Sequence, residues 1–96
     1  MRVAETILEQ LGGNKFAAMT GSKHFFAGDD FLGMKLIRNK SKANYLKITL
    51  TPADLYEMTF IKTTSRSVKT VLQFDSVYFD QLQEMFTSVT GLYTHL

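Results

Sequence analysis

The residues of this sequence that are best suited to chemistry are the cations of its middle third. Residues 35–70 hold eight Lys and Arg against two Asp and Glu, whereas the flanking segments are mildly acidic. Six of these cations fall in two stretches, "IRNKSKAN" at 37–44 and "IKTTSRSVK" at 61–69, where Ser, Thr and Asn stand between them. Cations, hydroxyls and amides are the groups that bind phosphate oxygens. The two stretches therefore favour a surface that binds nucleic acid; the alternative is a pair of ordinary solubilising loops.

Tyr45 and Lys47 extend this pattern onto a neighbouring strand. They occupy the polar positions of the alternating segment "YLKITL", so both are expected on the same face of a sheet. A tyrosine beside a lysine on an open sheet face can stack a nucleic-acid base, although an ordinary half-exposed cross-strand residue has the same pattern. The candidate binding residues are therefore Arg38, Lys40, Lys42, Tyr45, Lys47, Lys62, Arg66 and Lys69.

Other kinds of site are not supported by the sequence. The absence of cysteine excludes disulfides, thiolate zinc sites and cysteine nucleophiles. His24 and His95 are the neutral-pH acid–base candidates, and neither has further metal ligands at a suitable spacing. The glycines at 12 and 13 and the "TGSK" at 20–23 lack the spacing of a phosphate-binding P-loop, which also requires a strand before it and a helix after it. We expect no catalytic residues, no cofactor and no metal, and hence a protein that is not an enzyme.

The elements that must position the candidate residues follow from the hydrophobic periodicity. Apolar residues at helical spacing over 3–11, followed by two glycines, predict a helix that ends at the glycines. The segment "KFAAMTG" at 15–21 is then expected to leave as a strand. Further strands are predicted around 32–37, 45–50, 56–61 and 68–74, joined by polar turns. A last helix is predicted to begin at Asp75 or Ser76 and to end at Gly91.

This order predicts one α+β domain over residues 1–96, with an N-terminal helix, a four- to five-stranded antiparallel β-meander and a C-terminal helix packed on the sheet. If alternate hairpins of the meander emerge at one edge, the six loop cations form a single patch. The start "MRVAETILEQL" carries two glutamates within its apolar pattern, and no apolar run approaches the ~20 residues of a membrane span. We therefore expect a cytoplasmic protein without a signal peptide or a membrane contact.

A resemblance to a known protein family extends across nearly the whole chain. It rests on three stretches, "LGGNKFAAMTGSK", "NYLKITLTPADLYEMTF" and "FDQLQEMFTSVTGLYTHL". The sequence resembles a family of small, mostly uncharacterised proteins encoded by bacteriophages and prophages, with an LGGNKFxAMTG opening and a TGLYT end. The resemblance implies expression in the cytoplasm of a bacterial host. It assigns no functional residue.

Three hypotheses about function follow. The first is a small non-catalytic protein whose basic hairpin surface binds nucleic acid or a complex that contains nucleic acid. The second is a protein-binding inhibitor of a host defence system or a host enzyme. The third is a homo-oligomer in which an aromatic-rich edge pairs between chains.

Overall fold

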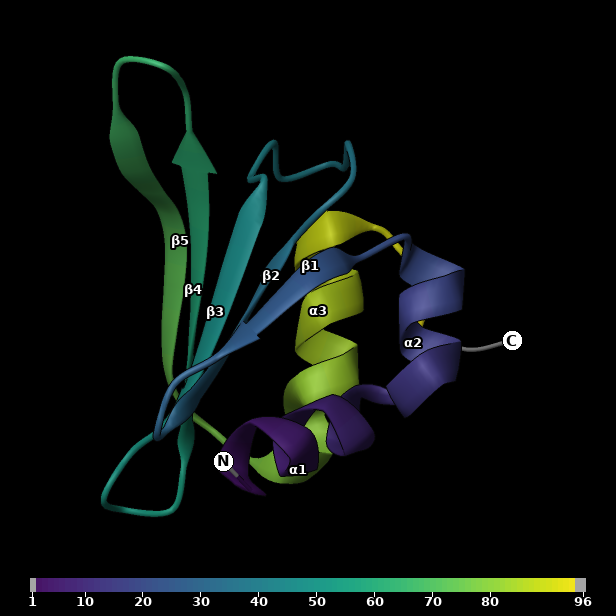
Figure 1. Cartoon of the computed structure of the whole chain (residues 1–96), viewed down its shortest axis with the longest axis vertical. Coiled ribbons are helices and arrows are strands. Elements are labelled where there is room, and N and C mark those ends of the chain that lie inside the picture. The colour runs from purple at the N-terminus through teal and green to yellow at the C-terminus, as the bar shows by residue number, and fades with distance from the viewer. Residues whose placement is uncertain (1, 95–96) are drawn as a thin grey trace.

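The computed structural model describes residues 2–94, with side chains from residue 3 onward; His95, one of the two candidate histidines, lies outside them. Within these residues one antiparallel sheet carries helices on one of its faces (Figure 1). In chain order the elements are α1 (Arg2–Leu11), α2 (Gly13–Thr20), β1 (Lys23–Ala27), β2 (Phe31–Lys35), β3 (Tyr45–Leu50), β4 (Tyr56–Thr63), β5 (Val68–Val77), the 3-10 turn η1 (Phe79–Gln81) and α3 (Leu82–Thr90). The predicted α+β class is confirmed.

The strands pair in the order in which they occur along the chain, β1-β2-β3-β4-β5, which confirms the predicted meander. Because side chains alternate along a strand, every second position faces the helices. The register aligns these apolar positions in two buried rows, Leu32–Ile48–Met58 and Met34–Leu46–Phe60. The alternating residues of the sequence therefore mark the inner face of the sheet, which we define as the face covered by the helices.

The helices close the core over this inner face. Ile7 of α1 and Phe86 of α3 are fully buried. Phe16 of α2 meets Phe86 edge to face, with 5.0 Å between the ring centroids. The hydroxyl of Tyr56 in β4 donates a hydrogen bond of 2.8 Å to Oε1 of Gln10 in α1. Burial raises the pKa of Tyr56 above its ordinary value.

The segment 15–21 forms α2 and not the expected strand, so that prediction is wrong. Gly12 ends α1 as expected, and its N–H donates a hydrogen bond to the carbonyl of Leu8. The positive φ angles of Gly12 and Gly13 then turn the chain directly into a second helix. Only Phe16 and Thr20 of α2 are buried. They are four residues apart and therefore share one helix face. Two buried positions in a segment of eight residues do not give a periodicity that distinguishes a helix from a strand.

The start of the C-terminal helix also differs from the prediction. Asp75 and Ser76 do not cap a helix, because β5 continues through Val77 with an irregular register near its end. The turn η1 follows, and Oε1 of Gln81 accepts the backbone N–H of Tyr78 ahead of α3. The predicted end at Gly91 is confirmed: its φ is +77°, in the left-handed region that favours glycine.

All helices within residues 2–94 lie on the inner face and leave the opposite face of the sheet uncovered (Figure 1). We call this opposite face the outer face. No helix among these residues is long and apolar enough to cross a membrane.

Candidate functional site

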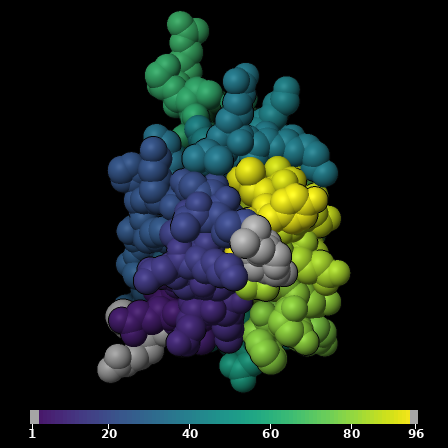
Figure 2. Space-filling model, turned by 90° about the vertical axis from the view of Figure 1, so that its right-hand side faces the viewer, coloured from purple at the N-terminus to yellow at the C-terminus, as the bar shows by residue number. Residues whose placement is uncertain are grey.

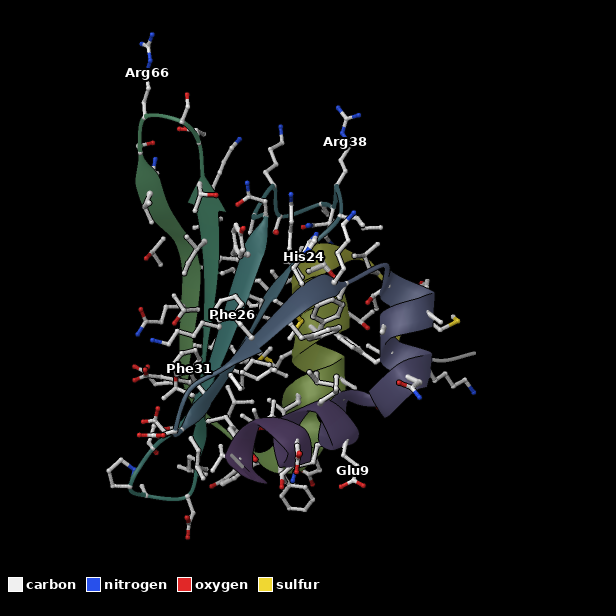
Figure 3. The ribbon with its side chains drawn as sticks, in the orientation of Figure 1. Glu9, His24, Phe26, Phe31, Arg38 and Arg66 are labelled. Atoms are coloured by element: carbon white, nitrogen blue, oxygen red, sulfur yellow. The ribbon has the colours of Figure 1, made fainter. Side chains whose placement is uncertain are left out.

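Opposite charges collect at the two ends of the sheet. In a meander, the β2–β3 and β4–β5 connections lie at one end, and the β1–β2 and β3–β4 connections lie at the other. We call residues 36–44 and 62–69 the basic end; neither segment contains Asp or Glu. The connections at the opposite end carry Asp29, Asp30 and Asp54. Figure 3 shows Arg38 and Arg66 pointing away from the body at the basic end, far from Glu9.

The β2–β3 loop is held in shape by its own polar side chains. Nδ2 of Asn39 donates to the carbonyls of Ile37 and Ala43, at 2.7 and 2.9 Å. Oδ1 of Asn39 accepts the N–H of Ser41 at 3.0 Å. The N–H of Lys40 donates to the carbonyl of Thr90, which ties the loop to the C-terminal end of α3. The exposed cations of this loop therefore project from a fixed backbone.

Asn44 joins the two hairpins of the basic end. Its side chain donates to the carbonyl of Thr63 and accepts the N–H of Thr63, at 2.9 and 2.8 Å. Its backbone N–H donates to the carbonyl of Ile61. The amide thus imitates a further residue pair of the β3–β4 ladder and extends the pairing to the end of β4. This contact sets the position of the β2–β3 loop relative to β4.

A pocket of about 340 Å³ lies where the two segments meet. Arg38 and Lys42 of the loop and Lys62 of β4 line it, together with Asn39 and Asn44. Lys62 stands directly opposite Lys69 in the β4–β5 pair. Like charges opposite each other destabilise a sheet, and a bound anion would relieve that repulsion. The pocket is therefore suited to a phosphate group.

The remaining candidate cations of the basic end lie outside this pocket lining. Arg66 stands at the turn of the β4–β5 hairpin, where Oγ1 of Thr64 accepts the N–H groups of Arg66 and Ser67 at 3.2 and 3.1 Å. Figure 2 shows this hairpin projecting above the body, with the β2–β3 loop beside it over the C-terminal end of α3. The two hairpins emerge at one end as expected, but only Arg38, Lys42 and Lys62 line a common pocket.

Tyr45 and Lys47 lie on the outer face. The register places Tyr45 between Lys35 of β2 and Ile61 of β4, and Lys47 between Gly33 and Thr59. Tyr45 is half-buried and Lys47 is exposed. These two candidates therefore form a separate group from the pocket cations on the other side of the sheet.

Two phenylalanines, which the sequence analysis did not include among the candidate residues, also lie on the outer face. The ring of Phe26 lies over Gly33 and is 49% exposed. The ring of Phe31 packs edge to face against Phe26, with centroids 6.2 Å apart, and Nζ of Lys47 lies 4.5 Å from the centroid of Phe31. The signal in the sequence was Gly33: a glycine inside an alternating strand often marks a place where another group approaches the backbone.

A shallow hollow of about 220 Å³ lies among these rings. Its lining includes Phe26, Tyr45 and Lys47, and it continues to Ile61 and Val68 beside the β4–β5 hairpin. The outer face thus combines exposed rings with cations. No group of three or more His, Asp or Glu side chains among the described residues is placed to hold a metal ion.

The resemblance to phage-encoded proteins stays a prediction from the sequence. Comparison of the chain with protein-family models, with curated proteins and with solved structures finds no match.

Proposed function

We propose that this protein is a small non-catalytic binding protein that binds nucleic acid through its basic end. The observation that carries the proposal is the pocket at the junction of the two hairpins. Arg38, Lys42 and Lys62 reach it from separate segments, and neither segment contains an acidic residue. Clustered cations with no nearby carboxylate attract a polyanion over a distance and pair with its phosphates on contact.

The surroundings of the pocket support the same proposal. Asn39 and Asn44 fix the backbone of the β2–β3 loop, so little loop order must be gained on binding. Arg66 at the hairpin turn and Lys40, whose N–H bonds to Thr90 at the end of α3, lie outside the pocket lining and can pair with neighbouring phosphates. On the sequence resemblance, we further propose a phage protein that acts in the cytoplasm of a bacterial cell.

The test is fluorescence anisotropy of a labelled oligonucleotide at several salt concentrations. Each phosphate contact lowers the logarithm of affinity by about 0.7–0.9 per decade of salt. Lys62→Glu removes a pocket cation and should weaken binding while making the salt slope shallower by about one such contact. Lys15→Glu is the matched control, because it makes the same charge change at an exposed position of α2 outside the basic end.

The two variants separate a local contact from the general effect of net charge. Equal losses for Lys62→Glu and Lys15→Glu would place binding outside the pocket. Absence of binding at low salt for the unmodified protein would refute the proposal and favour the protein-binding inhibitor. Lys15→Glu should change the free energy of unfolding by no more than about 0.5 kcal/mol. Lys62→Glu places an opposite charge across from Lys69 and should raise it by up to about 1 kcal/mol, so neither variant loses binding through unfolding.

A further inference from the structure

The outer face presents rings where a solvated sheet face normally presents polar side chains. Half of the Phe26 side chain is open to solvent although the outer atoms of its ring lie over Gly33. Tyr45 lines the same hollow as Phe26, and Ile61 and Val68 extend it toward the β4–β5 hairpin. Val68 is 75% exposed. A ligand that occupies the hollow would therefore meet the flat side of a ring and aliphatic groups together.

Cations surround these rings. Lys35 stands opposite Tyr45, and Lys23 stands opposite Lys35 on β1. Lys47 reaches over the ring of Phe31 from the next strand. The acidic residues Glu57 and Asp75 of the same face lie toward the other end of the sheet: Glu57 is opposite Thr49, and Asp75 follows Gln73, which is opposite Thr59. The half of the outer face that adjoins the basic end is thus positive.

We propose that the outer face stacks unpaired bases, so that the nucleic acid bound by this protein is single-stranded; this inference rests on the proposed function. Each base presents a flat π-surface to Phe26 or Tyr45, and Lys35 and Lys47 lie beside the rings to pair with the backbone phosphates. A duplex keeps its base faces stacked inside and cannot offer them to the hollow. Arg66, beyond Val68, then continues the phosphate track from the hollow to the basic end.

Charge argues against a second copy of this chain as the occupant. Pairing two outer faces with their basic ends aligned would bring Lys23, Lys35 and Lys47 of one copy close to the same residues of the other, which like-charge repulsion opposes. A negatively charged ligand with flat apolar surfaces satisfies both features of the face. Single-stranded nucleic acid has that chemistry.

The experiment compares a labelled single strand of about 16 nucleotides with a duplex of the same length, at fixed salt, by anisotropy. Tyr45→Leu keeps an apolar side chain but removes the π-surface. It should weaken single-strand binding by about fivefold or more, with the salt slope and duplex binding unchanged. Tyr93→Ala is the control, because Tyr93 is an exposed aromatic after α3, and it should leave both affinities unchanged.

A second readout uses the absence of tryptophan from the chain. Tyr45→Trp introduces a single reporter, whose fluorescence should be quenched by the single strand and not by the duplex. Equal affinity for single strand and duplex, with no effect of Tyr45→Leu and no quenching, would overturn the stacking inference and leave the proposed function intact. Absence of binding to either probe at low salt would refute the proposed function, and the inference with it.

Discussion

The placement of the Phe26 ring over Gly33 predicts the effect of one methyl group. In Gly33→Ala, the new Cβ would lie 2.2 Å from Cζ of Phe26 and 2.4 Å from its Cε2. Non-bonded carbon atoms require about 3.5 Å or more. The backbone of Gly33 does not have the positive φ that restricts other glycines of this chain, so alanine meets no backbone strain there. The ring must therefore move away from the sheet.

The size of the effect follows from the area that the ring covers. A fully buried Phe side chain removes at least ~150–200 Å² from water, and Phe26 is 49% exposed. Displacement of the ring returns about 100 Å² to water at most, or about 2.5 kcal/mol at ~25 cal/mol per Å². Replacing glycine by alanine in a strand gains about 0.5–1 kcal/mol. Gly33→Ala should therefore lower the free energy of unfolding by up to about 1.5–2 kcal/mol, and the Tm by up to about 10 °C.

A double-mutant cycle measured by urea denaturation tests this reasoning. Phe26→Ala removes the ring, so Gly33→Ala in that background should be neutral or stabilising by up to about 1 kcal/mol. The coupling between the two positions should be up to about 2.5 kcal/mol, which is the full cost of displacing the ring. An equal cost of Gly33→Ala with and without the ring would show that the ring does not rest on Gly33. Gly33→Ala should also weaken single-strand binding, because the displaced ring no longer lines the hollow.

Three further predictions concern the core, the hairpin junction and pH. Phe86→Ala should lower the free energy of unfolding by about 3–5 kcal/mol, which thermal melts followed by circular dichroism will measure. Asn44→Ala leaves the N–H and carbonyl of Thr63 without their partner; it should cost about 1–3 kcal/mol in urea melts and weaken oligonucleotide binding. Because burial raises the pKa of Tyr56 above its ordinary value of 10.0, the stability that this shift contributes is present below pH 10 and is lost above it. Tyr56→Phe should remove this part of the alkaline decline in the urea midpoint.

The sheet could be predicted from the sequence because burial on one face dictates its pattern. The central strands β3 and β4 have a neighbouring strand on each side and helices over one face, so apolar and polar residues alternate regularly along them. Their buried residues include Leu46, Ile48, Met58 and Phe60. The edge strand β5 has little burial before Val77, and its end was therefore mistaken for the start of a helix. The short α2 gives a similarly weak periodic signal.

The sequence predicted which residue types form the basic end, but not how these residues are arranged in space. The loop cations were visible as a local excess of charge. Some of these cations line the pocket and others lie at a separate hairpin turn, and this arrangement depends on the contact of Asn44 with Thr63. The two residues are 19 positions apart in the sequence, so no local pattern indicates that they meet. Phe25 and Phe26 are adjacent strand residues, which face opposite sides of a sheet. Phe25 packs against the core and Phe26 lies outside.

The topology converts an alternating charge pattern along the chain into a separation of charge in space. The four connections between strands carry acidic, basic, acidic and basic residues in turn, with Asp29 and Asp30, the 36–44 loop, Asp54, and Arg66. Strands that pair in chain order place the first and third connections at one end and the second and fourth at the other. A connection that crossed the sheet would have mixed the two signs. A polyanion would therefore be attracted to the basic end, and under the proposed stacking its unpaired bases would meet the outer face, which adjoins that end.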